Sequence, residues 1–165
     1  MPQRENPFGP VSTAMVTPMT SDLNVDYAQL VTLAEHLVHH GSSSLVAVGT
    51  TGEAPTLTSE EKLKIFETLV SHFDGKVPII AGTGSNSTQA TIAFSQAAEA
   101  TGVDALLVVN PYYNKPSQEG LVAHFTAVAN AVKTPIILYN HPGRTGVAQS
   151  LETTIELAKH PRAIR

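Results

Sequence analysis

The fold is decided by two short apolar runs, Leu106-Leu107-Val108-Val109 and Ile136-Ile137-Leu138. Both runs are continuously apolar rather than alternating, so both faces of each strand are expected to be buried. Strands covered on both faces are typical of parallel sheets in α/β proteins. We therefore predict two parallel strands, over Ala105–Val109 and Pro135–Tyr139, with a helix between them.

The same unit repeats along the whole chain. Six apolar, β-branched segments begin every 28 to 33 residues, which is the length of one strand, one helix and two loops. This spacing predicts five βα units followed by the start of a sixth strand. The six predicted strands are Val11–Val16, Ser44–Val48, Val77–Ala81, Ala105–Val109, Pro135–Tyr139 and a segment beginning at Ala163.

The intervening helices have recognisable start and stop signals. The segment Asp26–His40 carries one apolar face and stops at Gly41, a residue type that favours helix C-termini. Thr58 is an expected N-cap, and Glu61 is its expected capping-box partner. The remaining predicted helices run from about Thr88 to Ala100, onward from an N-cap at Ser117, and over roughly Leu151–Lys159.

Composition excludes several classes of protein. The chain has 165 residues, of which 42% are hydrophobic and 15% charged, so it can bury a sizeable core. A net charge of −4 without a Lys/Arg cluster argues against nucleic-acid binding. The absence of cysteine excludes disulfides and thiolate metal sites. The sequence has no run of eighteen apolar residues, so no membrane-spanning helix is predicted. Because the segment Met1–Pro7 lacks the apolar core of a signal peptide, the expected location is the cytoplasm.

Two architectures are compatible with five βα units. The length favours an open doubly wound sheet, whereas a whole (β/α)₈ barrel needs about 250 residues. The loops favour the barrel, because informative residues follow every predicted strand from the second to the fifth. In a barrel these loops converge on one site, and in an open sheet only those at a switch point do so.

The loops after the second and third predicted strands are rich in glycine and hydroxyl groups. Gly49-Thr50-Thr51-Gly52-Glu53 offers backbone N–H groups beside two hydroxyl donors, which suits a carboxylate or a phosphate. The alternative for this segment is a tight turn held by threonine hydroxyls. Gly82–Ser87 lacks the third glycine of a dinucleotide site and the Gly-Lys-Ser/Thr of a P-loop, so a turn feeding a helix N-cap is the favoured interpretation.

The loops after the fourth and fifth predicted strands carry phenols and an arginine. We expect one of Tyr112 and Tyr113 to plug the rim of the core and the other to offer its phenol for proton transfer or for a partner contact. Tyr139 ends an apolar strand, so a core tyrosine and a catalytic one are both open. Arg144 lies in a glycine-rich turn, where its N–H donors suit a carboxylate, although a surface arginine is the simpler alternative.

Histidine contributes less to the functional interpretation. His36, His39 and His40 have the spacing of a metal site, but a solvated helix end is the better interpretation. No role is assigned to His141, and no metal site is predicted.

Taken together and in this order, the loop motifs resemble the dihydrodipicolinate synthase / N-acetylneuraminate lyase family. Each motif is weak alone, but together and at matching spacing they are specific. The Thr-Thr pair and the Pro-Ser-Gln-Glu-Gly segment resemble the dihydrodipicolinate synthase branch more than the sialic acid lyases. The matching segments are Ala14–Pro18, Gly49–Glu53, Ile80–Gly84, Pro111–Gly120, Leu138–Asn140 and Arg144–Gly146.

The resemblance implies a (β/α)₈ barrel in which residues 1–165 form the N-terminal part of a single domain, about the first five βα units and the start of strand six. It implies a lysine that forms a Schiff base with pyruvate, and an enamine that attacks aspartate-4-semialdehyde in lysine (diaminopimelate) biosynthesis. No metal or organic cofactor is implied.

Site residues follow from the resemblance position by position. Thr50, Tyr113 and Tyr139 match the proton relay, with Tyr139 as the acid/base and Thr50 linking the two phenols. Tyr113 would reach in from a neighbouring subunit, which implies a homo-oligomer of at least two chains, and a tetramer is expected. Thr51 would hold the pyruvate carboxylate, and Arg144 would hold the carboxylate of the aldehyde.

The Schiff-base lysine is the one departure. It is expected about two positions beyond Arg165, so we interpret the sequence as a fragment that is inactive alone. Two competing functions stay open: another pyruvate-dependent aldolase of the family, such as an N-acetylneuraminate lyase or a keto-deoxy sugar acid aldolase, and a non-catalytic βα module that binds an anion.

Overall fold

The structure is a computed structural model that describes residues 6–164. The chain divides into two compact units, and the boundary falls inside the strand β3, between Ile80 and Ala81. Each unit is described by itself below.

The first unit pairs parallel strands beside two packed helices. β1 pairs with β2 in parallel, with Ser12 opposite Ser44, and the amide of Leu45 donates to the carbonyl of Pro78 just before β3. The helices α1 and α2 pack against each other. The elements are β1 (Ser12–Ala14), α1 (Tyr27–His39), β2 (Ser44–Ala47), the short 3₁₀ helix η1 (Ala54–Thr56), α2 (Ser59–Phe73) and the first half of β3 (Ile79–Gly82).

Both long helices of this unit begin at a capping side chain, of which only the one at Thr58 was predicted. The Asp26 carboxylate accepts a hydrogen bond from the amide of Gln29 at 2.9 Å. At α2 the predicted capping box is confirmed, because the Glu61 amide donates to the Thr58 hydroxyl and the Thr58 amide donates to the Glu61 carboxylate. These hydrogen bonds from Thr58, led by its backbone amide, hold the pKa of Glu61 below its usual range.

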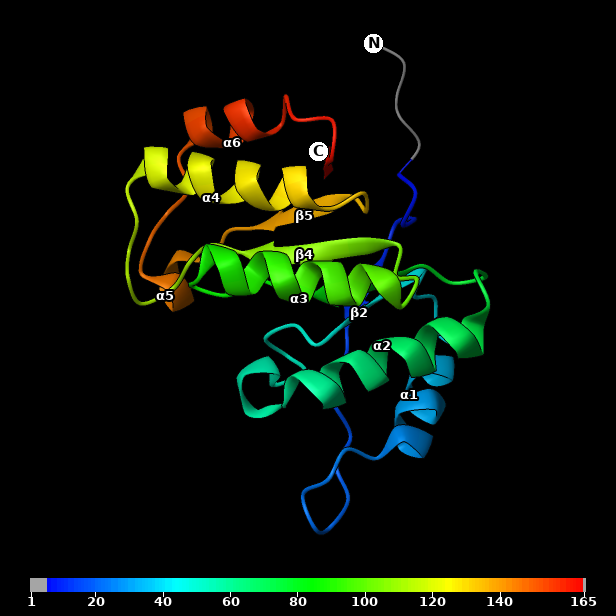
Figure 1. The fold of residues 1–165 in the computed structure, drawn as a ribbon. Helices are drawn as coiled ribbons and strands as arrows, with labels where there is room; N and C mark the ends of the chain where they lie inside the picture. Colours follow the sequence, from blue (N-terminus) through cyan, green and yellow to red (C-terminus); the bar gives the residue numbers. More distant parts are fainter. Residues whose placement is uncertain (1–5, 165) are drawn as a thin grey trace. The chain divides into compact units, whose positions relative to one another are not determined.

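The second unit is also built on parallel strands. β4 pairs with β5, with Leu106 opposite Ile136 and Val109 opposite Tyr139, and β5 pairs with β6. Figure 1 shows α3 beside α4 and α4 beside α6. The elements are the second half of β3, α3 (Thr88–Ala100), β4 (Ala105–Val109), α4 (Gln118–Ala131), β5 (Ile136–Tyr139), the single turn α5 (Pro142–Thr145), α6 (Leu151–Leu157) and β6 (Ala163–Ile164).

Burial differs between the two faces of β4, and this corrects the prediction that both would be covered. Leu106 and Val108 are completely buried, whereas Leu107 and Val109 on the other face are half-buried. Because side chains alternate along a strand, helices packed on one side cover only every second residue. In β5 the residue facing the same way as Ile137 is Tyr139, and both are half-buried.

Strand order decides between the two predicted architectures. In the first unit β1 is followed by β2 and β3, and in the second β3 is followed by β4, β5 and β6. Each strand therefore neighbours the next one in sequence, whereas a doubly wound sheet reverses its order at a switch point. The doubly wound alternative is wrong.

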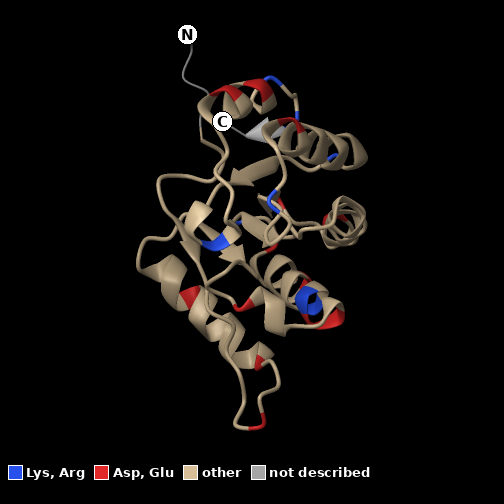
Figure 2. Ribbon diagram, turned by 90° about the vertical axis from the view of Figure 1, so that its left-hand side faces the viewer, with Lys and Arg blue, Asp and Glu red and all other residues tan. Residues whose placement is uncertain are grey.

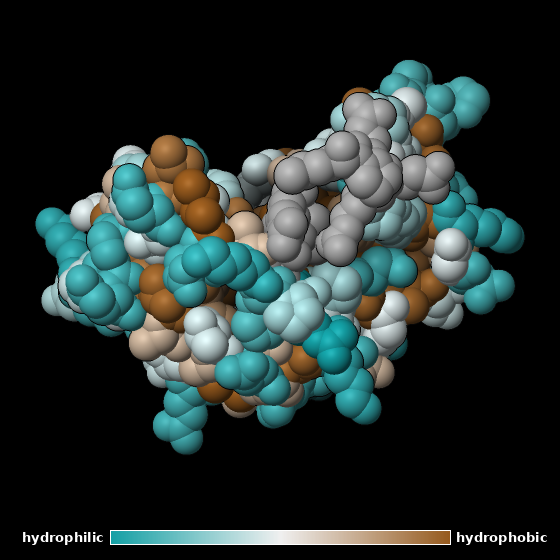
Figure 3. All heavy atoms as spheres, turned by 90° about the horizontal axis from the view of Figure 1, so that it is seen from above, coloured by the Kyte–Doolittle hydropathy of each residue, from teal (hydrophilic) through white to brown (hydrophobic). Residues whose placement is uncertain are grey.

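The described surface is mixed in character. Figure 2 shows acidic and basic residues scattered over helices and loops rather than gathered on one element. On the face seen in Figure 3, apolar and polar side chains are interspersed. Among the described helices, none is long and apolar enough to cross a bilayer.

Candidate active site

In the first unit, the turn after β2 is fastened to the segment that follows β1. The hydroxyl of Thr17, which is buried, donates to the carbonyl of Gly52 at 2.7 Å. A Cβ at Gly52 would lie 3.2 Å from the Met15 carbonyl oxygen and from the amide nitrogen of Val48, so a larger residue would need the backbone to shift by a few tenths of an ångström. The turn is therefore held in place by its backbone contacts.

Thr50 and Thr51 sit on this fastened turn with exposed side chains. The turn itself is closed by backbone bonds, from Gly52 to Gly49 and from Glu53 to Thr50, each at 3.1 Å. Neither threonine hydroxyl bonds another described residue. The alternative of a turn held by threonine hydroxyls is therefore wrong, and the hydroxyls remain available as donors.

In the second unit, the loop after β4 exposes both tyrosines. Tyr113 is 88% exposed and Tyr112 39% exposed, so the prediction that one of them plugs the core is wrong. Tyr113 and Lys115 both have left-handed backbones, with φ of 72° and 44°, and this turns the loop outward. Left-handed non-glycine residues are strained and gather at functional sites.

Tyr139 ends β5 on the half-covered face of the sheet. Its carbonyl accepts a hydrogen bond from the amide of Asn110 at 3.0 Å, which ties the ends of β4 and β5 together. The ring is half-buried and lies edge-on to the ring of His141, with centroids 6.0 Å apart. A fully buried core tyrosine is therefore excluded, and the phenol has no hydrogen-bond partner among the described residues.

Arg144 lies in the single helical turn α5, which the sequence did not predict. The turn starts at Pro142 and ends at Gly146, whose φ of 72° favours glycine. A Cβ at Gly146 would lie 2.9 Å from Cε of Lys115, so the lysine stem covers this glycine and joins the loops after β4 and β5. The Arg144 side chain is exposed, and its guanidinium bonds no described residue.

Three amide side chains hold the segment that carries Arg144, and sequence reasoning gave none of them a role. They are Asn110, Gln118 and Asn140, which we call the amide cluster, and the backbone of Gln149 is one of the groups that they bind. Two of them directly follow a strand end and one is the first residue of a helix. These positions within the sequence motifs were the only sign in the sequence that they could have a role. Asn110 and Gln149 are buried, at 0% and 7% exposure.

The histidines at the end of α1 and His141 differ in their surroundings. His36, His39 and His40 are exposed at the end of α1, as predicted. No cluster of residues that could hold a metal occurs within residues 6–164. The Nδ1 atom of His141 is buried and lacks a hydrogen-bond partner in the described part of the chain.

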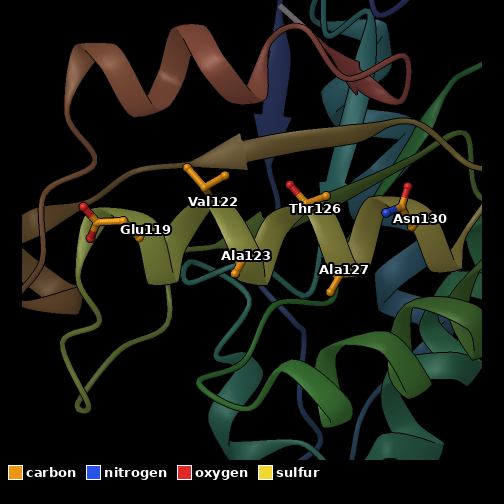
Figure 4. Close-up of a pocket in the computed structure, with 6 residues that line it drawn as sticks. All are labelled: Glu119, Val122, Ala123, Thr126, Ala127 and Asn130. Carbon is orange, nitrogen blue, oxygen red and sulfur yellow. The ribbon is translucent and has the colours of Figure 1, made fainter.

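A surface hollow lies on α4, and none of its lining residues is a predicted site residue (Figure 4). Its lining comes from a single helix, half of it small apolar side chains and half polar ones. The lining residues are Glu119, Val122, Ala123, Thr126, Ala127 and Asn130. It is not a candidate active site.

Residues 7–164 match the sequence profile of the dihydrodipicolinate synthetase family. The chain belongs to this family. It is 54% identical over 151 residues to 4-hydroxy-tetrahydrodipicolinate synthase of Bacillus subtilis, and 59% identical over 152 residues to the protein of that name from Symbiobacterium thermophilum. In both cases the match covers 92% of this chain and 52% of the relative, so the chain spans about half the length of the curated relatives it matches.

Solved structures of the family give the same result. Dihydrodipicolinate synthase of Bacillus anthracis superposes with a TM-score of 0.93 at 48% identity, covering 94% of this chain and 53% of that one. The enzyme of Acinetobacter baumannii, solved in complex with pyruvate, superposes with a TM-score of 0.91 at 48% identity, covering 94% and 54%. The predicted fold is confirmed: the chain corresponds to the first half of a (β/α)₈ barrel of this family.

Proposed function

We infer that this chain is the N-terminal part of a single-domain (β/α)₈ synthase that condenses pyruvate with aspartate-4-semialdehyde to 4-hydroxy-tetrahydrodipicolinate. The observation that carries this proposal is identity of 54% and 59% to synthases of that name over nearly the whole chain. The Schiff-base lysine that binds pyruvate would come from chain beyond Arg165, as it does in the sequence-based expectation. The proposed role is in lysine biosynthesis in the cytoplasm.

The second unit supplies groups suited to proton transfer. Tyr139 has a half-buried phenol without a hydrogen-bond partner among the described residues, and it is proposed as the acid/base of imine formation. Tyr113 is 88% exposed on a strained backbone, which suits a side chain that enters the site of a neighbouring subunit. A phenol relay moves protons without placing a fixed negative charge beside the imine. This assignment makes a homo-oligomer part of the proposal, with a tetramer expected.

The carboxylates of the two substrates would be bound by groups from different loops. Thr51 offers an exposed hydroxyl on the turn after β2 and is proposed to hold the pyruvate carboxylate, while Thr50 links the phenols. The guanidinium of Arg144 has no partner among the described residues and is proposed to bind the carboxylate of the aldehyde, because its forked donors match that group. These hydroxyl, phenol and guanidinium groups act without a cofactor in the proposed reaction.

The experiment uses a chimaera in which this chain replaces the matching half of the Bacillus subtilis synthase. Pyruvate and aspartate-4-semialdehyde consumption and the product mass are measured. We expect synthase activity, and Tyr139→Phe should lower kcat by roughly 10²–10⁴-fold, the usual weight of one acid–base group. Tyr27→Phe, at the start of α1, is the matched control.

Two results would contradict the proposal. A chimaera that folds but accepts only other aldehydes with pyruvate would assign the chain to a different aldolase of the family. Turnover of Tyr139→Phe equal to that of Tyr27→Phe would remove Tyr139 from the relay.

A further inference from the structure

One side chain joins the two ends of the segment that carries Arg144, residues 140–149. Asn140, directly after β5, pairs with the backbone of Gln149 on both sides of that residue. Its Oδ1 accepts from the Gln149 amide at 3.1 Å, and its Nδ2 donates to the Gln149 carbonyl at 3.3 Å. The buried Asn110 also donates to Asn140 Oδ1, at 2.9 Å, and so anchors this contact to the end of β4.

A second amide side chain, that of Gln118, also binds the backbone next to Gln149. Gln118, the first residue of α4, donates from Nε2 to the Ala148 carbonyl at 2.9 Å and accepts at Oε1 from the Ser150 amide at 2.9 Å. The same Oε1 accepts from the hydroxyl of Thr153, which is buried, at 2.8 Å. One side chain thus fixes the backbone on either side of Gln149.

Arg144 is connected to these hydrogen-bonded residues by the short turn α5, which has several internal hydrogen bonds. The amides of Arg144 and Thr145 both donate to the carbonyl of His141, and the Thr145 hydroxyl donates to the Val147 carbonyl at 2.9 Å. Since the guanidinium bonds no described residue, its position depends on the backbone below it. The holding groups are uncharged amides. Unlike carboxylates, they do not compete with an anionic ligand for the guanidinium.

We propose that Gln118 and Asn140 are positioning residues that set the place of the Arg144 guanidinium and thereby the affinity for the carboxylate of the second substrate. This inference rests on the proposed function for its catalytic readout. Neither side chain is placed against the reacting atoms. Their effect runs through the backbone of residues 141–148.

The first test uses Gln118→Met in the chimaera, which removes all three hydrogen bonds at similar volume. The KM for aspartate-4-semialdehyde should rise by about tenfold, the consequence of unpairing hydrogen-bonding groups of which two are partly buried. The KM for pyruvate and kcat should stay within about twofold, because the lost contact is made equally in the ground state and the transition state. Gln96→Leu is the matched control, since Gln96 donates to the Ala131 carbonyl at 3.0 Å at the other end of α4.

The second test asks whether Gln118 acts through Arg144. If it does, adding Gln118→Met to Arg144→Ala should change the aldehyde KM little, because the group being positioned is already gone. Gln118→Glu keeps the acceptor for Ser150 and Thr153 but cannot donate to Ala148, so it should give an intermediate KM. Multiplicative effects of the two changes, or an unchanged aldehyde KM in a variant with the parental melting temperature, would overturn the proposal.

A readout without catalysis separates this inference from the proposed function. Hydrogen exchange of the backbone amides in residues 141–150 should be faster in Gln118→Met and in Asn140→Ala than in the parent chimaera, and unchanged in Gln96→Leu. If the parent has no synthase activity but exchange responds in this way, the proposed function fails and the hold on the Arg144 segment stands. Equal exchange in all variants refutes the hold.

Discussion

Replacing Gly84 by alanine tests how tightly the loop after β3 approaches β4. A Cβ at this position would lie 3.0 Å from Cγ1 of Val109, and well inside van der Waals contact of the Val109 amide nitrogen. The nearest obstacle is backbone, so no side-chain rotation relieves the clash. Either the loop or the end of β4 has to move.

The cost of that movement follows from what Val109 holds. Val109 is opposite Tyr139 in the sheet, and the next amide, that of Asn110, donates to the Tyr139 carbonyl. Overpacking costs about 1–3 kcal/mol, and a weakened backbone hydrogen bond adds about 0.5–1.5 kcal/mol. We expect Gly84→Ala to lower the free energy of unfolding by about 2–4 kcal/mol, which is roughly 3–7 °C in melting temperature for a chimaera about twice as long as this chain.

Calorimetry of the chimaera measures this loss against two glycines with different surroundings. Gly75 has a φ of 73° but no atom within 4 Å of its Cβ position, so Gly75→Ala should cost only the backbone strain, about 1 kcal/mol. Gly49 has neither strain nor a close neighbour, and its nearest atom is 3.7 Å away. If Gly84→Ala melts within about 2 °C of Gly49→Ala, the steric reasoning is refuted.

Two further predictions concern a helix cap and a buried histidine. Thr58→Ala should lower stability by about 1–2 kcal/mol in urea denaturation, because it removes the capping box at α2, whereas Thr32→Ala within α1 should cost less than about 0.5 kcal/mol. Burial lowers the pKa of His124. Its Nδ1 atom is hydrogen-bonded to the Thr88 hydroxyl at 2.9 Å. The unfolded chain therefore binds a proton more readily than the folded one, so stability falls as the pH drops through about 6.5 towards the folded pKa. His124→Gln should flatten this dependence in melts between pH 7 and pH 5, by at most about 1.4 kcal/mol per pH unit, and an unchanged slope would contradict it; His39→Gln, on the exposed end of α1, serves as the control.

Local signals in the sequence located most of the regular structure. α3 and β4 have the predicted bounds, and the predicted N-caps at Thr58 and Ser117 are both present. These features depend on residues close together in sequence, which a pattern reveals. The predicted strand Val11–Val16 shortens to Ser12–Ala14, because pairing with β2 rather than apolarity sets its ends.

Features that depend on distant contacts were missed. The turn α5 lies in a segment with proline and glycine that reads as a loop, and its geometry depends on amides contributed by β4 and α4. The half-covered face of β4 was also missed, because apolarity does not say which neighbours are there to cover a strand. Site assignments for Thr50, Thr51, Tyr113, Tyr139 and Arg144 came from the family resemblance and stay predictions.

The sequential order of the strands has a consequence for synthesis on the ribosome. Within each unit every strand neighbours the one made just before it, so no strand has to wait for a partner from far downstream. Chains emerge at about 5–20 residues per second, which is slow compared with helix formation and loop closure. Each new βα unit can therefore dock onto an existing edge as it leaves the ribosome, so that on the growing side only the newest strand is unpaired at any time.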